Sequence, residues 1–314
     1  MTTEINYAHS WDFKPEPPRL QQVRDGIFAY IQPDGGWMLN NAGFLVGTDA
    51  VTVIDTCGTE PRTKAFIAAI RSVTDKPLRT LINTHFHGDH TYGNSFFLPQ
   101  ASVIAHEKCR QGVIATGLGL KPLFPTANFG EITIAPPFVT FEDRLNVYVD
   151  DLKIELFYVG PSHTTSDVVA WLPARQLLFT GDLIFKNCTP FVLQGAIAPY
   201  FAVLDRLRAL GATTIVPGHG PVCGPECFDE VAQYLHFIQD TAKRGFEAGL
   251  EPLELARQTD LGQFGGWNDS ERLVGNLQRA YSELRGEPFG TPLPLAQIAM
   301  EMQAYSGHPV HCLA

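Results

Sequence analysis

The six residues from His85 to His90 include three imidazoles and one carboxylate, which are common protein ligands of metal ions. Imidazole and carboxylate ligands favour zinc, but they also bind iron or manganese. The half-apolar run at residues 78–83 predicts a buried strand, so these candidate ligands follow the end of a strand. On extended backbone His85 and His87 point the same way, whereas Asp89 and His90 follow where the chain turns. Two ligand directions from one loop suit two metal ions better than one.

A histidine-rich tract alone could be a weak surface trap for metal ions, so the rest of the chain has to supply further ligands. Three more predicted strands each end in small or turn-forming residues that carry one candidate ligand. These strands, at residues 152–159, 176–179 and 213–216, are followed by His163, Asp182 and His219. Four strand ends of this kind indicate a specific metal site in the folded protein rather than a weak surface cluster.

In this order, HxHxDH at residues 85–90 followed by the three later ligands resembles the motif series of the metallo-β-lactamase superfamily of hydrolases. The resemblance spans about residues 23–224. It implies an α/β fold, a four-layer αββα sandwich with its site at one edge between two sheets. It also implies two metal ions held by seven side chains. The expected ligands of one ion are His85, His87 and His163, those of the other are Asp89, His90 and His219, and Asp182 bridges both.

Two metal ions about 3.5–4 Å apart can share a water and lower its pKa, which makes a bridging hydroxide available as the nucleophile. Asp89 and Asp182 are the expected catalytic residues, Asp89 by orienting the hydroxide and Asp182 by holding the ions together. True β-lactamases of this family generally carry Cys or Ser at the position of Asp182. An aspartate there resembles glyoxalase II and the lactonases. We therefore expect a dinuclear zinc hydrolase that cleaves an ester, lactone or thioester.

Three alternatives stay open at the level of sequence. One is a mononuclear iron enzyme similar to the persulfide dioxygenases, which would use mainly His85, His163 and Asp182. Another is a hydrolase of β-lactam amides, and the third is a non-catalytic binding protein. The complete ligand series argues against the third, because degenerate members of a family tend to lose ligands.

Composition narrows the partners and the compartment. The chain of 314 residues has 45% hydrophobic residues and a formal net charge of −10, which argues against a nucleic-acid partner. No apolar run is long enough for a membrane span, and residues 1–22 lack the pattern of a secretory signal. The six cysteines are scattered, so reduced thiols and a cytoplasmic location are expected. The expected partner is a small-molecule substrate, and a homo-oligomer stays open.

We divide the chain into three predicted parts. Residues 1–22 are rich in proline after Lys14 and read as an extended N-terminal arm. Residues 23–224 form the metallo-β-lactamase-fold catalytic domain. Residues 225–314 form a C-terminal helical extension without metal-ligand spacing, and Asp269 and Ser270 are expected to cap its third helix.

Several loops are expected near the site. Residues 117–137 and 185–199 are long irregular connections, which favours a lid or a pocket wall. Residues 33–36 predict a hairpin turn, and Trp37 beside it either covers the site or packs. Asp55, at the end of an apolar strand, either orients a ligand histidine or caps a turn.

Overall fold

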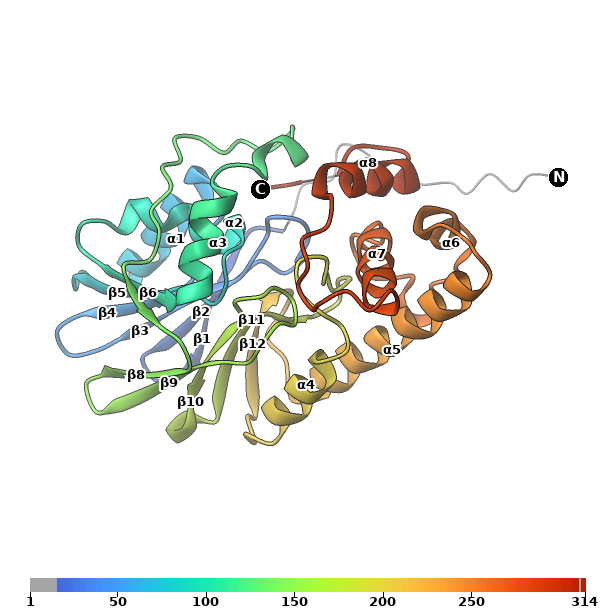
Figure 1. Ribbon diagram of the computed structural model, residues 1–314. Helices are drawn as coiled ribbons and strands as arrows, with labels where there is room; N and C mark the ends of the chain where they lie inside the picture. The colour runs from blue at the N-terminus through green and yellow to red at the C-terminus, as the bar shows by residue number, and fades with distance from the viewer. Residues whose placement is uncertain (1–15, 311) are drawn as a thin grey trace.

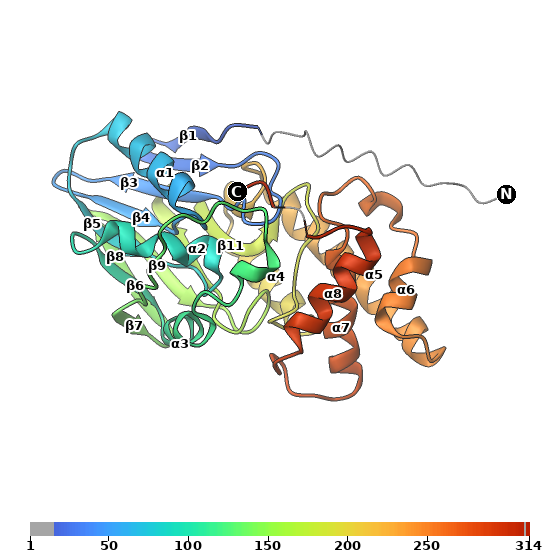
Figure 2. The same ribbon diagram turned by 90° about the horizontal axis from the view of Figure 1, so that it is seen from above.

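The computed structural model describes residues 16–310 and 312–314, and two β-sheets lie face to face in it (Figures 1 and 2). The first sheet has seven strands in sequential order, antiparallel from β1 to β4 and parallel from β4 to β7. Its strands are β1 (Arg19–Arg24), β2 (Ile27–Ile31), β3 (Ala42–Val46), β4 (Val51–Ile54), β5 (Leu78–Ile82), β6 (Ser102–His106) and β7 (Val139–Phe141).

The second sheet has five strands in the order β12-β11-β10-β9-β8. It is antiparallel except for the parallel pair of β11 and β12. Its strands are β8 (Arg144–Val149), β9 (Leu152–Tyr158), β10 (Val168–Leu172), β11 (Leu177–Phe185) and β12 (Thr214–His219). Leu45, Ile82, Leu156 and Phe179 belong to the buried apolar layer that joins the two sheets.

Helices cover the outer face of each sheet and complete four layers, as the fold class predicted from the sequence requires (Figure 1). On the first sheet lies α1 (Glu60–Val73), which buries Phe66 against the strands. Thr59 caps this helix by accepting a hydrogen bond from the Arg62 amide, and Pro61 lies in its first turn, where no amide donor is needed. On the second sheet lie α4 (Tyr200–Arg208) and α5 (Glu226–Glu247).

Two further helices lie near the first sheet, α2 (Gly88–Thr91) and α3 (Glu107–Thr116). Three helices follow α5 along the chain: α6 (Pro252–Gln258), α7 (Arg272–Leu284) and α8 (Leu295–Ser306). The helices α5 to α8 lie together beyond one end of the sandwich (Figures 1 and 2). Their apolar side chains join the core cluster of the second sheet, so this segment packs on the sandwich through a shared core. The predicted domain boundaries stay a prediction.

Four sequence expectations need correction or qualification. Residues 1–15 of the expected arm lie outside the described residues. Residues 19–22 are not part of an extended arm but belong to β1. The proline cluster ends at Pro18, and Gly26, with φ +67°, lies in the turn that pairs β1 with β2. The link between β2 and β3 is much longer than a tight hairpin turn. The strands β11 and β12 continue through Asp182 and His219 rather than ending before them.

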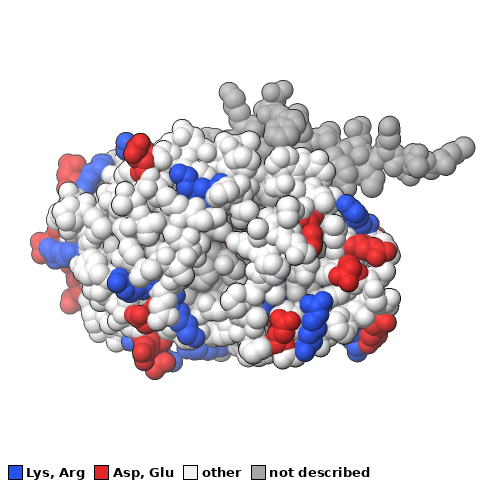
Figure 3. All heavy atoms as spheres, turned by 45° about the horizontal axis from the view of Figure 1, so that its top comes forward, with Lys and Arg blue, Asp and Glu red and all other residues white. Residues whose placement is uncertain are grey.

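The cap expected for α7 is also wrong. This helix begins after Glu271 without a side-chain cap, and Asp269, with φ +59°, instead forms an ion pair of 2.8 Å with Arg272. Within residues 16–310 and 312–314, no helix is both long enough and apolar enough to cross a membrane. Figure 3 shows one face, on which basic and acidic side chains are interspersed around a largely uncharged centre.

Candidate metal centre

All seven candidate ligands lie together in the folded chain, and all are buried. They form two groups of potential metal ligands, and within each group the ligand atoms lie within 4.8 Å of one another. The first group is His85, His87, His163 and Asp182, and the second is Asp89, His90, Asp182 and His219. Asp182 is the member that both groups share, as the resemblance implied. Their role as ligands stays a prediction.

Both sheets contribute to this centre. His85 and His87 follow β5 of the first sheet, and Asp89 and His90 lie in the short helix α2 that comes next. From the second sheet come His163 in the β9–β10 loop, Asp182 within β11 and His219 at the end of β12. The centre therefore lies at one edge of the sandwich, between the sheets.

A glycine allows β12 to come close to β11 at Asp182. A Cβ atom at Gly218 would collide with the Asp182 carboxylate and with the backbone of Gly181. The pairing of the two strands shifts register on both sides of Gly181, whose φ is +52°. This local irregularity turns Asp182 towards the centre without ending the strand.

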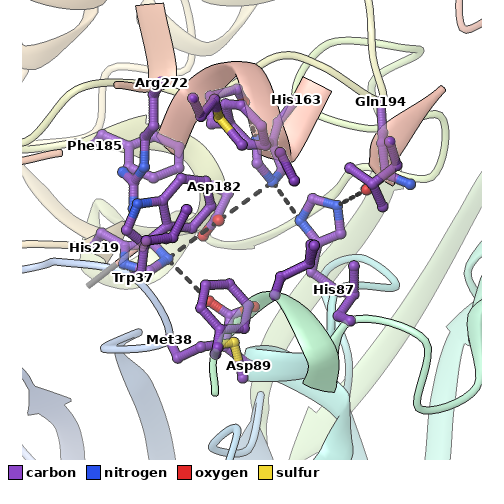
Figure 4. Close-up of a pocket in the computed structure, with 18 residues that line it drawn as sticks. Trp37, Met38, His87, Asp89, His163, Asp182, Phe185, Gln194, His219 and Arg272 are labelled. Atoms are coloured by element: carbon purple, nitrogen blue, oxygen red, sulfur yellow. Dashed lines mark hydrogen bonds and ion pairs between the residues drawn. The ribbon is translucent and has the colours of Figure 1, made fainter. Parts of the chain in front are cut away.

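The Asp182 carboxylate is the geometric middle of the site (Figure 4). Its Oδ1 lies 2.9 Å from His90 Nε2, and its Oδ2 lies 3.3 Å from both His163 Nε2 and His219 Nε2. Asp89 Oδ2 lies 3.2 Å from His219 Nε2, on the side away from His163. The Asp182 carboxylate thus faces both ligand groups, whereas the Asp89 carboxylate faces only the group that contains His219.

Each of the five histidines uses its outer ring nitrogen in a hydrogen bond, which fixes the tautomer. The outer N–H groups of His87, His90 and His219 donate to Gln194 Oε1 at 2.7 Å, Asp55 Oδ2 at 2.9 Å and the Gly35 carbonyl at 3.0 Å. That of His163 donates to the Phe191 carbonyl, and that of His85 to Thr84 Oγ1 at 3.1 Å. Since these partners act as acceptors, the inner nitrogen of each ring can present a lone pair to a bound ion. Without an ion, the neighbouring carboxylates, Asp182 above all, outweigh burial and raise the pKa of His90 and His219.

The centre therefore fits metal ions. Lone pairs from five imidazoles and two carboxylates converge on a buried space, an arrangement that cations stabilise. His85 Nε2 is buried without a hydrogen-bond partner, and the 2.9 Å contact between His90 Nε2 and Asp182 Oδ1 lacks the geometry of a hydrogen bond, which also suits metal coordination. Burial lowers the pKa of His163 to about 3, so this ring is a neutral ligand at physiological pH.

Asp55 orients a ligand histidine, one of the two roles expected for it. Its Oδ2 accepts the His90 N–H, and it also accepts the hydroxyl of Thr84 at 2.7 Å. Because the Thr84 proton is used in this way, the Thr84 oxygen accepts from His85. Asp55 thus supports one histidine from each half of the centre.

A cavity opens beside the centre and extends away from it between the loops (Figure 4). Of the predicted substrate contacts, Leu123, Phe124, Phe191 and Gln194 line it, together with Trp37. Phe129, which belongs to the 117–137 loop expected to form a lid or a pocket wall, packs against Tyr92 instead.

The sequence left the role of the C-terminal segment open, and the structure brings part of this segment to the cavity. Arg272 of α7 and Leu295, Ala299 and Met302 of α8 all line it. The spacing of the last three by four and three residues, which places them on one face of a helix, was the available signal. Spacing within α8 does not show what that face packs against.

A two-sheet sandwich with two buried groups of His and Asp side chains at one edge is typical of a class of metal-dependent hydrolases. Residues 35–219 match the family model of the metallo-beta-lactamase superfamily, more than half of the chain, and the protein belongs to this superfamily. It is accordingly a metal-dependent enzyme of the hydrolase type.

Relatives and solved structures agree with this membership. The linear primary-alkylsulfatase of Pseudomonas sp. (strain ATCC 19151) is 27% identical over 68% of this chain, but the match spans only 48% of that protein. The metallo-beta-lactamase type 2 of Bacteroides fragilis is 24% identical over 71% of this chain and 88% of its own length. A metallo-beta-lactamase from Pontibacter korlensis shares the fold, with a TM-score of 0.58, 17% identity, and coverage of 70% of this chain and 99% of that chain.

Proposed function

We propose that the protein is a dinuclear zinc-dependent hydrolase that cleaves a carboxylic ester, a lactone or a thioester. The observation that carries this proposal is the pair of buried ligand groups that share Asp182. A single iron held mainly by His85, His163 and Asp182 would leave the second group, with Asp89, His90 and His219, without a function. Two groups of donors support two ions.

When bound, the two ions supply a water of lowered pKa and positive charge for the substrate's carbonyl oxygen. The protein's own groups determine where this chemistry occurs. Burial favours protonation of Asp89, but His90 and His219 outweigh it and hold the pKa of Asp89 at about 2. Asp89 therefore stays a carboxylate at neutral pH, the form that would coordinate an ion or accept a hydrogen bond from the attacking water.

The bond cleaved is argued from Asp182 and from the cavity. An aspartate at this position resembles glyoxalase II and the lactonases, which supports an ester, lactone or thioester over a β-lactam amide. A sulfate ester is a second candidate, because the matched alkylsulfatase is named for alkyl sulfates and the cavity beside the centre is mostly apolar.

The test combines metal analysis with a substrate panel. Protein purified without added metal or chelator should contain about two zinc ions per chain and hydrolyse an ester, lactone or thioester. The panel also contains an alkyl sulfate and a β-lactam, whose selective hydrolysis would move the reaction to that bond. About one iron per chain, with oxygen uptake on addition of a persulfide, would replace the proposal with the dioxygenase.

A matched pair of variants tests the bridging role. Asp182→Ala should lose at least one metal ion per chain and most of the turnover, because both groups contain this carboxylate. His236→Ala is the control, since His236 stacks on Phe201 with ring centroids 4.3 Å apart, outside the centre. Unchanged zinc content in Asp182→Ala would contradict the dinuclear proposal.

A further inference from the structure

The cavity beside the metal centre has two chemically different ends. At one end lie the side chains of His87, Asp89, His163, Asp182 and His219. The other end is apolar and comes from two distant parts of the chain. Its lining residues are Leu120, Leu123 and Phe124 of the 117–137 loop and Leu295, Ala299 and Met302 of α8. We call this second end the apolar compartment.

Among the described residues, Arg272 is the one Lys or Arg side chain that lines the cavity. Its Nη1 donates to the Thr189 carbonyl at 2.8 Å and its Nη2 pairs with Asp269 at 2.8 Å, whereas its Nε is buried without a hydrogen-bond partner. The rings of Trp37 and Phe185 lie 4.2 and 5.2 Å from the guanidinium carbon. The six residues that define the apolar compartment are all uncharged.

The size of the cavity limits what it holds. Its volume is about 60 Å³, and one water molecule needs roughly 10–15 Å³ on this measure. The whole cavity, including its metal-ligand end, therefore holds about four to six water-sized groups on this scale. The cavity also opens to solvent, so a longer chain can extend outwards without entering a further apolar wall.

We propose that the apolar compartment binds the non-reacting part of the substrate, a short uncharged alkyl or aryl group. This inference rests on the proposed function, because it places the scissile bond at the metal-ligand end of the same cavity. The substrates are then esters of apolar character rather than esters whose far end is anionic. The helix α8 selects them by the side chains at positions 295, 299 and 302.

The first experiment measures kcat/KM for ethyl esters of unbranched acids from two to ten carbons, and for alkyl acetates of the same lengths. The value should rise about fourfold for each methylene up to about six carbons, because each buried methylene contributes about 0.8 kcal/mol. It should then level off. Ethyl hydrogen glutarate, which carries a carboxylate at the far end of its five-carbon chain, should react at least tenfold more slowly than ethyl pentanoate.

Two methionines of α8 provide a matched pair of variants. Met302 is 2% exposed and lines the cavity, whereas Met300 is 63% exposed. Met302→Ala should flatten the dependence on chain length, and Met300→Ala should leave it unchanged. Ala299→Phe, which fills the compartment, should lower kcat/KM for hexanoate more than for acetate. Circular dichroism and zinc content verify that each variant folds and holds metal.

A binding measurement separates this inference from the proposed function. Calorimetric titration of the metal-loaded protein with 1-hexanol should show binding that Met302→Ala weakens and Met300→Ala preserves. If no ester is hydrolysed but this binding pattern holds, the proposed reaction is wrong and the apolar compartment stands. If esters are hydrolysed without dependence on chain length, or the glutarate reacts as fast as pentanoate, the reaction stands and the inference is overturned.

Discussion

A single carboxylate supports ligands in both halves of the metal centre. Asp55 Oδ2 accepts the outer N–H of His90, and through the Thr84 hydroxyl it also fixes the tautomer of His85. Asp55 Oδ1 accepts the Thr84 amide at 2.8 Å, so all of these bonds end on one side chain. Its φ of +58° is unusual for a residue other than glycine, and the surrounding hydrogen bonds maintain it.

Replacing Asp55 by Asn tests this role at the scale of one residue. Asn tolerates the same backbone conformation, but it has one oxygen fewer, so either His90 or Thr84 loses its acceptor. We expect zinc affinity to fall about 10–100-fold, the range found when such outer partners of metal ligands are removed. Competition with a chromogenic chelator measures it. Asp49→Asn, at an exposed position, is the control and should bind zinc as the original protein does.

At the scale of elements, α7 fixes the loop that supports two ligand histidines. One face of this helix carries four polar side chains that bond to the backbone of residues 189–198. Arg272, Asn276 and Arg279 donate to the carbonyls of Thr189, Pro190 and Leu193, and Glu283 accepts from the amides of Ile197 and Ala198. Within this loop, Phe191 and Gln194 accept from His163 and His87. The helix thus acts on the metal centre through the loop.

The variant Asn276→Leu tests that connection. Asn276 is fully buried, and its Oδ1 accepts the Val192 amide at 2.9 Å while its Nδ2 donates to the Pro190 carbonyl at 2.8 Å. Leaving these backbone groups unpaired should cost about 1–3 kcal/mol of unfolding free energy and weaken zinc binding. Urea denaturation and zinc competition measure the two effects. Arg285→Ala, at the exposed end of α7, should change neither; equal zinc affinity in both variants would mean that the loop does not depend on α7.

At the scale of the whole molecule, the metal centre joins the two sheets. His85, His87, Asp89 and His90 follow the first sheet, and His163, Asp182 and His219 belong to the second. Because each ligand group takes members from both sheets, bound ions link the two halves of the sandwich. Without cations, the same buried carboxylates and imidazoles lack the charge that balances them.

Removing metal should therefore destabilise the entire fold. An ion present at 1,000 times its Kd stabilises the folded state by about 4 kcal/mol, so chelation should lower Tm by roughly 6 °C for each ion lost from a chain of this size. Differential scanning calorimetry with chelator, and then with zinc in excess, measures the loss and its recovery. Asp182→Ala should show a smaller shift than His236→Ala, which retains the centre. A Tm that chelator leaves unchanged in metal-loaded protein would contradict a link between the sheets.

The sequence by itself identified the seven residues that the fold brings together at the candidate metal centre, and the strands that precede or contain them. His85 to His90 and the later ligands each follow or end a short apolar strand, and strand signals and ligand types are local properties of the chain. The helix predicted at residues 60–73 agrees with α1, because Thr59 and Pro61 mark its start locally. The αββα fold followed from the family resemblance that these motifs carry, and superfamily membership confirms it.

Only the tertiary structure decided how the two ligand groups share Asp182 and what forms the cavity next to them. Arg272 and Met302 reach that cavity from helices far along the chain, and Asp269 pairs with Arg272 instead of capping α7. The strand β1 likewise forms because it pairs with β2, whereas its own residues do not predict a strand. The spacing of residues along the chain encodes the periodicity of an element and the signals at its ends, whereas the surface on which that element packs depends on the rest of the folded chain.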